Sequence, residues 1–194
     1  MGSYVKIADF ITPKKINNVS VDVFESTGSF GELMDGLMKG EKYAILKING
    51  VIMMSETPME HRTNSDFIHH AYGDVLIGGL GIGMIIMAIQ DDPKINSITV
   101  IENNQDLIDI ISTQIPFNEK VTIIQEDVFK WKPNTKYDCI YMDIWAYINS
   151  DVYKEEMVPL KRKYGHYLKS IKESPNRFNK CWAEYQAKNN LRLR

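Results

Sequence analysis

The fold is decided by one stretch of the chain, Asp74-Val-Leu-Ile-Gly-Gly-Leu-Gly-Ile-Gly83. A short apolar run leads into a glycine-rich turn, and a second apolar segment, Met84–Gln90, follows at once. This order predicts a buried strand over Val75–Gly79, a tight turn and then a helix. Glycines in such a turn let the backbone approach a ligand closely, and the helix N-terminus offers free N–H groups. The stretch therefore predicts a nucleotide-binding loop; a tight turn that binds no ligand is the alternative.

The alternation of strand and helix continues downstream of this loop. We expect strands over Ser97–Glu102, Val121–Gln125 and Tyr137–Asp143, and an amphipathic helix over Gln105–Ile115. Apolar strands separated by helices indicate a parallel sheet that is covered on both faces. The expected fold class is therefore α/β, with a Rossmann-like sheet.

Strand signals stop after Tyr147, so we expect the sheet to be shortened at its C-terminal side and followed by a helical tail over residues 151–194. One helix is expected over Asp151–Ser170, interrupted near Pro159, and a second from Ser174 onward. Residues 154–194 contain eleven Lys or Arg and only four Glu, although the whole chain carries a net charge of −2. Such a basic tail could contact nucleic acid, but packing against the acidic body or a solvated helix face is favoured.

A β-hairpin is predicted over residues 42–55. The β-rich segments Lys42–Ile48 and Val51–Ser55 flank Asn49-Gly50, which supplies both positive-φ positions of a type I′ turn. Upstream, Val19–Phe24 alternates with the period of a strand.

Capping and polar residues predict the helices and the loop that complete the N-terminal part, and they set the division into domains. Ser29 and Glu32 are spaced as a capping box, which predicts a helix over Phe30–Lys39. Residues 56–64 are predicted to form a loop, and Ser65–Ala71 a short helix. We therefore divide the chain into an N-terminal extension, residues 1–64, and a Rossmann-like domain, residues 65–194.

The spacing of the glycines narrows the class of ligand. The dinucleotide fingerprint needs a small residue where Met84 stands, and Met is too large for that helix–strand contact. The observed spacing, Gly79-x-Gly81-x-Gly83, instead resembles the first motif of the class I S-adenosylmethionine-dependent methyltransferases. The resemblance extends to Glu102, which ends the second expected strand 23 residues after Gly79. It implies that this carboxylate binds the ribose hydroxyls of S-adenosylmethionine; a solvated glutamate is the alternative.

The same resemblance implies the rest of a cofactor site. An acidic residue after the third strand, here Asp127, would meet the adenine amino group, and the backbone N–H of Val128 a ring nitrogen. Ile101 and Val128 would sandwich the adenine. The cofactor-binding residues expected in full are Gly78, Gly79, Leu80, Gly81, Gly83, Glu102, Asn103, Asp127, Val128, Asp143 and Ile144.

Catalytic candidates cluster near the end of the fourth expected strand. Tyr137-Asp-Cys-Ile-Tyr-Met-Asp143-Ile-Trp-Ala-Tyr147 resembles the fourth motif of these methyltransferases. Asp143 is therefore expected to orient or deprotonate the acceptor, with His70 or His69 as a helper because histidine exchanges protons near neutral pH. The alternative for both histidines is a polar helix face. Trp145 and Tyr147 are expected to form either an aromatic wall or core packing.

A narrower resemblance covers residues 42–147. The hairpin, the segment Asp66-Phe-Ile-His-His70 and the glycine loop are together similar to spermidine synthase. Two features depart from that family, which carries an Asp in the loop where Leu80 and Ile82 stand, and an Asp-Pro-rich stretch after its catalytic Asp. Nor does the sequence assemble the acidic side chains that polyamine binding needs. The chain also lacks the Asn/Asp-Pro-Pro motif of DNA amino-methyltransferases. Magnesium-dependent methyltransferases need further oxygen ligands on the next strand, and these are missing too, so no metal is expected.

Three functions follow from these resemblances. The leading one is an S-adenosylmethionine-dependent methyltransferase that acts on a small-molecule acceptor. The alternatives are aminopropyl transfer and a non-catalytic cofactor-binding module that docks through its tail. The hairpin and the short sheet also suggest self-association.

Composition sets the remaining expectations. No apolar run reaches ~18 residues, so no transmembrane helix is expected, and we expect a soluble, cytoplasmic protein. Cys139 and Cys181 are expected to be buried thiols, since the chain has no C-x-x-C pair.

Overall fold

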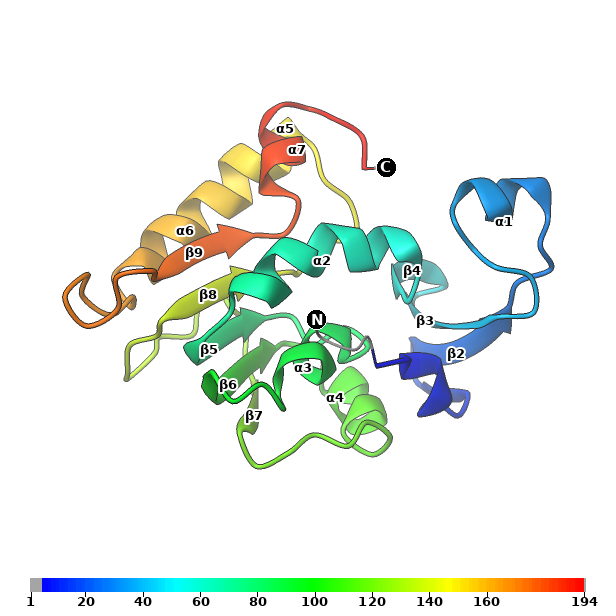
Figure 1. Cartoon of the computed structure of the whole chain (residues 1–194), viewed down its shortest axis with the longest axis horizontal. Helices are drawn as coiled ribbons and strands as arrows, with labels where there is room; N and C mark the ends of the chain where they lie inside the picture. Colours follow the sequence, from blue (N-terminus) through cyan, green and yellow to red (C-terminus); the bar gives the residue numbers. More distant parts are fainter. Residues whose placement is uncertain (1–4, 194) are drawn as a thin grey trace.

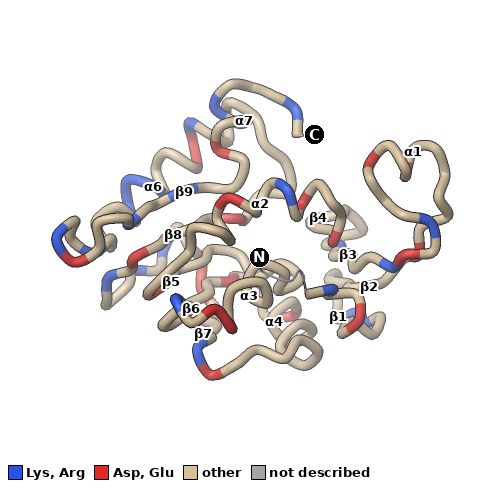
Figure 2. The backbone as a smooth tube through the Cα atoms, viewed as in Figure 1, with Lys and Arg blue, Asp and Glu red and all other residues tan. Residues whose placement is uncertain are grey.

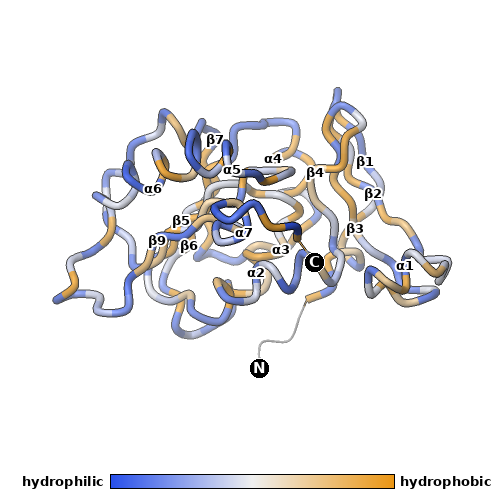
Figure 3. The backbone as a smooth tube through the Cα atoms, turned by 90° about the horizontal axis from the view of Figure 1, so that it is seen from above, coloured by the Kyte–Doolittle hydropathy of each residue, from blue (hydrophilic) through white to orange (hydrophobic). Residues whose placement is uncertain are grey.

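The computed structural model describes residues 5–193, which form two β-sheets with helices around them (Figure 1). A four-stranded antiparallel sheet, in the order β1-β2-β3-β4, is built from the N-terminal part of the chain. A five-stranded parallel sheet, in the order β7-β6-β5-β8-β9, is built from the rest. Seen from above, the antiparallel sheet lies at one end of the molecule and helix α6 (Val158–Gly165) at the other (Figure 3).

The parallel sheet has the Rossmann strand order. Its strands are β5 (Gly73–Gly78), β6 (Ile95–Glu102), β7 (Val121–Gln125), β8 (Cys139–Met142) and β9 (Phe178–Cys181). Numbered within this sheet, the order reads 3-2-1-4-5, and the direction of winding changes between β5 and β8. The expected α/β class with a Rossmann-like sheet is confirmed. In such sheets ligands bind at the carboxyl ends of the strands near this switch point.

Helices cover both faces of the parallel sheet, because side chains alternate along each strand. One face packs against helices α2 (Pro58–His70), α3 (Met84–Ile89) and α4 (Gln105–Ile111). The other packs against helix α6, the π-helical turn η2 (Tyr153–Met157) and helix α7 (Glu184–Lys188). A short helix, α5 (Ser150–Val152), leads into η2.

The predicted hairpin is part of a larger antiparallel sheet. Strands β3 (Lys42–Ile48) and β4 (Val51–Ser55) have the predicted bounds, and both turn residues, Asn49 and Gly50, have positive φ. Strands β1 (Lys14–Ile16) and β2 (Val19–Glu25) extend this hairpin on the β3 side.

A buried carboxylate fastens the first residues to this sheet. Glu56 accepts backbone hydrogen bonds from Ile7, from Ala8 at 2.8 Å and from Ala44 at 3.3 Å. Ile7 and Ala8 belong to the short 3-10 helix η1 (Ile7–Asp9). Because a buried acceptor is costly unless it is hydrogen-bonded, these bonds fix the segment over the sheet.

Three helices differ from prediction. The capping box of Ser29 and Glu32 is present, but helix α1 (Phe30–Met34) ends early, and Gly36 follows in the left-handed conformation. Helix α2 begins at Pro58, so the loop predicted over residues 56–64 is wrong. Proline is well tolerated at a helix start, where its missing N–H is not needed. The expected domain boundary after residue 64 therefore lies inside α2. Helix α4 ends at Ile111, four residues earlier than predicted.

The prediction of a helical C-terminal tail is also wrong in part, because the tail contains a strand. Strand β9 pairs with β8 in parallel register, from Cys139–Phe178 to Met142–Cys181, and adds a fifth strand to the sheet. Sequence patterns miss this strand because its two middle residues, Asn179 and Lys180, are polar. Both cysteines are buried and free, as predicted.

Basic residues lie along α6 and β9 (Figure 2), and two of them pair with acids. Lys161 lies 2.5 Å from Glu184, and Lys180 lies 2.6 Å from Asp66 on α2. These contacts favour packing within the molecule over a free nucleic-acid surface. Between residues 5 and 193, no helix is long and apolar enough to cross a membrane.

One ionic cluster ties the tail to the start of the parallel sheet. The ammonium of Lys169 lies 2.7 Å from Asp74 and 2.6 Å from Asp138. Burial alone would raise the pKa of Asp138, but hydrogen bonds from Lys169, the Asp74 backbone and Ser174 lower it below its usual value.

We predict that Lys169→Met lowers the free energy of unfolding by about 2 kcal/mol at pH 7, because a buried carboxylate loses its cation. Urea denaturation measures this change. The stabilisation of Asp138 is present above its unfolded pKa, near 3.8, and is lost as the pH falls further. The penalty should therefore shrink below about pH 4. Lys172→Met, at an exposed position, is the control and should stay within about 0.5 kcal/mol of wild type. Equal stability of the two variants at pH 7 would contradict the role of the cluster.

Candidate active site

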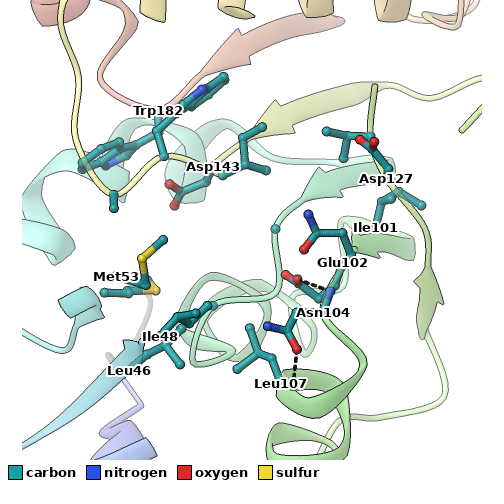
Figure 4. Close-up of a pocket in the computed structure, with 18 of the residues that line it drawn as sticks. Leu46, Ile48, Met53, Ile101, Glu102, Asn104, Leu107, Asp127, Asp143 and Trp182 are labelled. Atoms are coloured by element: carbon teal, nitrogen blue, oxygen red, sulfur yellow. Dashed lines mark hydrogen bonds between the residues drawn. The ribbon is translucent and has the colours of Figure 1, made fainter. Parts of the chain in front are cut away.

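A cavity of about 380 Å³ lies at the carboxyl ends of the parallel strands, at the switch point of the sheet (Figure 4). This volume lies within the range of small-molecule sites. The segments after β5, β6, β7 and β8 form one part of its wall, and strands β3 and β4 with helix α2 form another. The lining residues are Leu46, Ile48, Met53, Met54, Glu60, Gly79, Gly81, Ile101, Glu102, Asn103, Asn104, Leu107, Glu126, Asp127, Val128, Phe129, Asp143, Ile144, Trp145, Ala146 and Trp182.

The glycine loop is pressed against the segment that follows β8. Gly79 has a φ of +97°, and a Cβ at this position would lie 2.1 Å from the carbonyl oxygen of Asp143. The N–H of Asp143 donates to the carbonyl of Gly78 at 2.8 Å. Gly81 makes room in a different direction, since a Cβ there would meet the sulfur of Met54 on β4. The glycine loop thus contacts both the segment after β8 and strand β4 of the antiparallel sheet.

Glu102 is fixed at the end of β6. Its side chain is buried, and one carboxylate oxygen accepts a hydrogen bond from the Leu80 N–H at 3.0 Å. The other accepts the N–H of Asn104 at 2.8 Å. Each oxygen can accept a second hydrogen bond. The carboxylate is therefore held rigidly beside the glycine loop while it keeps acceptor capacity for a ligand.

The end of β7 adds a polar and an apolar surface. Asp127 accepts the Phe129 N–H at 2.8 Å, and its second oxygen lies 3.5 Å from the ammonium of Lys130. Ile101 and Val128 are buried and line the same part of the cavity. An acidic acceptor beside two apolar side chains suits a flat heteroaromatic ring that carries an amino group.

A pair of carboxyl groups occupies the opposite part of the cavity. Asp143 follows β8, and Glu60 extends from α2 with only 8% of its surface exposed. Burial raises the pKa of Asp143 well above its usual value, and the negative charge of Glu60 raises it further. Burial also raises the pKa of Glu60 to about 7, against a backbone hydrogen bond from Ser55. Because neither charge is neutralised, at least one of the two carboxyls is protonated near neutral pH.

Helix α2 places Glu60 by docking onto the sheet. Phe67 stacks on Tyr141 of β8 with ring centroids 4.2 Å apart, and the Tyr141 hydroxyl donates to Asn64 at 2.8 Å. The indole N–H of Trp182 donates to Thr63 at 2.9 Å, so the residue after β9 is held to the same helix. The acidic pair therefore depends on three segments that are far apart in the sequence.

Most of the predicted site residues come together at this cavity. Those that line it are Gly79, Gly81, Glu102, Asn103, Asp127, Val128, Asp143 and Ile144, together with Trp145 from the expected aromatic wall. Three of the predicted cofactor-binding residues do not line it. Gly78 lies against Met142, Leu80 contributes its N–H to Glu102, and Gly83 forms the N-cap of α3.

The predicted histidine helpers lie elsewhere. The rings of His69 and His70 bond to backbone carbonyls of Ser65 and Asp66 on the exposed face of α2. The side chain of His70 is 65% exposed and is not among the lining residues. Tyr147, at 69% exposure, is also outside the cavity. The structure thus corrects the assignment of a catalytic role to His70, because helix periodicity turns this residue toward solvent.

Sequence reasoning missed the side of the cavity that strands β3 and β4, helix α2 and the residue after β9 form. Glu60 stood in a segment interpreted as a loop, and Trp182 in one interpreted as a helix. Recognition of β9 would have found Trp182, because the residue after a parallel strand lies at the ligand-binding edge. The apolar residues Leu46, Ile48, Met53 and Met54 belong to the predicted hairpin, but nothing in their sequence indicates that they face the glycine loop.

The charged side chains that line the cavity are all acidic. Five carboxyl side chains line the cavity, those of Glu60, Glu102, Glu126, Asp127 and Asp143. Within residues 5–193, no Lys, Arg or His side chain is part of the lining. The cavity therefore favours a ligand with positive charge and disfavours one with phosphate groups. The same part of the chain has no group of three or more His, Cys, Asp or Glu that could hold a metal ion.

Neither a protein-family model nor a curated protein sequence matches this chain. Among solved structures, the N-methyltransferase NodS from Bradyrhizobium japonicum WM9 has a TM-score of 0.45 and 14% identity, covering 58% of this chain and 64% of that one. The plantazolicin methyltransferase BpumL, in complex with a pentazolic desmethylPZN analog and SAH, has a TM-score of 0.44 and 18% identity, covering 59% and 45%.

A third similar structure is an S-adenosylmethionine-dependent methyltransferase from Clostridium acetobutylicum ATCC 824. Its TM-score is 0.41 and its identity 18%, covering 57% of this chain and 47% of that one. This chain thus spans less than two thirds of the length of each of the three proteins. Likenesses at these TM-scores do not assign a function, which has to be argued from the cavity itself.

The raised pKa of Glu60 predicts how stability depends on pH. The folded state holds this proton up to about pH 7 and the unfolded state only to about pH 4.5, so the wild type loses stability as the pH rises through this window. Glu60→Gln removes the effect. We predict that its stability relative to wild type increases by about 2–3 kcal/mol between pH 5 and pH 8.

Urea denaturation of both proteins at the two pH values measures this difference. The comparison with wild type separates Glu60 from His61, whose pKa burial lowers to about 4 and which acts in the opposite sense. Glu119→Gln, at an exposed position outside the cavity lining, is the control. Its free energy of unfolding relative to wild type should be the same at the two pH values. The same flat profile for Glu60→Gln would show that Glu60 titrates normally.

Proposed function

We propose that this chain is an S-adenosylmethionine-dependent transferase, and first of all a methyltransferase that acts on a small-molecule acceptor. The observation that carries the proposal is an acidic lining with no basic side chain beside a strand–glycine loop–helix unit. S-adenosylmethionine bears a sulfonium and an ammonium against one carboxylate, so its net charge is positive. Dinucleotides and nucleoside phosphates are anionic and would be repelled by the same lining.

Residues at one side of the cavity match the parts of this cofactor. The fixed carboxylate of Glu102 would accept hydrogen bonds from the ribose hydroxyls. Ile101 and Val128 would enclose the adenine, and Asp127 would accept a hydrogen bond from its amino group. When bound, the cofactor supplies an electrophilic carbon on its sulfonium.

The remaining residues would bind and shield the acceptor. Leu46, Ile48 and Met53 form an apolar wall that excludes water, and desolvation with close placement supplies much of the rate enhancement in such transfers. Asp143 would orient the acceptor and take a proton from it. Figure 4 shows its carboxylate on the same side of the cavity as Met53 and Trp182, across from Glu102 and Asp127.

Aminopropyl transfer from decarboxylated S-adenosylmethionine is the second candidate. One observation favours it: the described lining offers no cationic side chain to a methionine carboxylate. Against it, Leu80 and Ile82 are buried in the core, so the loop has no place for the acidic residue of spermidine synthases. A non-catalytic cofactor-binding module is the third candidate, and it predicts cofactor binding without turnover.

Calorimetry with S-adenosylmethionine, its decarboxylated form, NAD and ATP tests the proposal. We expect S-adenosylmethionine to bind at least about tenfold more tightly than NAD or ATP, which corresponds to about 1.4 kcal/mol. Glu102→Gln should weaken its binding by about 1.5–3 kcal/mol, because hydrogen bonds from the ribose to a charged acceptor are lost.

Two comparisons keep this test decisive. Glu119→Gln removes one acidic charge far from the cavity and should leave the affinity unchanged. Tighter binding of NAD than of S-adenosylmethionine would refute the assignment of the cofactor. Preference for the decarboxylated form would select aminopropyl transfer instead.

A further inference from the structure

We propose that the acceptor is a primary amine carried on a single apolar body, with its nitrogen bound at the Glu60–Asp143 carboxyl pair. This inference rests on the proposed function, because the cofactor would occupy the part of the cavity near Glu102 and Asp127. The acceptor is then left with the part formed by strands β3 and β4, helix α2 and the residue after β9.

Within residues 5–193, no cationic side chain lines the cavity beside the carboxyl pair. Glu60 is more than nine-tenths buried, and among the same residues its hydrogen bond comes from the backbone of Ser55. No group in residues 5–193 donates a hydrogen bond to the carboxylate of Asp143, which points into the cavity (Figure 4). A buried carboxyl and a half-buried one that repel each other leave hydrogen-bonding capacity which a ligand can satisfy.

An ammonium group satisfies this pair better than other small groups do. Its positive charge lets both carboxylates ionise, and it carries three N–H donors for their oxygens. A hydroxyl offers only one donor and no charge. A carboxylate or phosphate would add a third negative charge to a buried site.

The walls around the pair indicate what carries the nitrogen. Trp182 presents an indole fixed by its hydrogen bond to Thr63, and such a ring face attracts a nearby cation. Beyond it, the wall formed by Leu46, Ile48 and Met53 is apolar. A second ammonium farther along the acceptor would lose its water against this wall without gaining a partner. The site therefore fits a monoamine with a hydrocarbon body better than a diamine.

The same pair can prepare the nitrogen for reaction. One N–H bond of the ammonium breaks, the proton bonds to a carboxylate oxygen of Asp143, and the electron pair stays on nitrogen as its lone pair. Glu60 keeps its negative charge, so the proton is held within the pair. The nitrogen lone pair would then form a bond to the transferred carbon while the bond from that carbon to sulfur breaks and its electron pair stays on sulfur. The positive charge thus passes from sulfur to nitrogen, and the product leaves as an ammonium ion.

The test measures binding of four probes to protein saturated with S-adenosylhomocysteine: hexylamine, 1-hexanol, hexanoate and 1,6-diaminohexane. Ligand-observed NMR gives each affinity without turnover. We expect hexylamine to bind at least about tenfold more tightly than hexanol and than the diamine, and hexanoate to bind least. Glu60→Gln and Asp143→Asn should each abolish the preference for hexylamine over hexanol. Glu119→Gln should keep it.

Each outcome decides a separate part of the inference. Equal binding of hexylamine and hexanol by the wild type would overturn the amine assignment, whether or not the variants fold. Tighter binding of the diamine would overturn the monoamine body. Unchanged preference in Glu60→Gln that still binds S-adenosylhomocysteine would remove this residue from the acceptor site. Failure of the wild type to bind S-adenosylhomocysteine would overturn the proposed function and, with it, this inference.

Discussion

The close approach of two backbone segments, at Gly79 and Asp143, sets the geometry of the whole site. A side chain at Gly79 would overlap the Asp143 carbonyl, and the Asp143 N–H is already bonded to Gly78. This contact brings the end of β8 over the loop that follows β5, directly at the switch point of the sheet. Glu102 and Asp143 therefore line one cavity, although Glu102 ends β6 and Asp143 follows β8, on opposite sides of β5.

Helix α2 is the second element on which the site depends, because it joins the two sheets and contacts both. It follows β4 closely, docks on β8 through Phe67 and Tyr141, and holds Trp182 through Thr63. The acidic side chain of Glu60 is thereby buried among groups that do not neutralise it. Under the proposed function, stability and function oppose each other at this point, since Glu60 is a buried carboxyl that a hydrophobic residue would replace at lower cost.

The part of the molecule that could be predicted from sequence is the part encoded in contiguous stretches. Strands β5, β6 and β7 follow from their apolar runs. Glu102, which ends β6, and Asp127, which lies just after β7, are predicted from their resemblance to methyltransferase motifs, and both line the cavity. The hairpin follows from Asn49-Gly50 and the β-rich segments on either side of it. Strand β9 could not be predicted, because only pairing with β8 makes a strand of Phe-Asn-Lys-Cys. Glu60 and Trp182 reach the cavity through tertiary contacts, which no local pattern records.

The two sides of the cavity are encoded in separate parts of the chain, and this division bears on how such a protein can diverge. Residues that face the expected cofactor lie mainly between Gly79 and Val128, whereas much of the opposite wall belongs to the antiparallel sheet and α2. Under the proposed function, substitutions in the antiparallel sheet and α2 would alter the acceptor side of the cavity while the segment Gly79–Val128 keeps its sequence. The lining residues between Leu46 and Glu60 thus form a compact target for mutagenesis that reshapes one wall and leaves the sequence of the other unchanged.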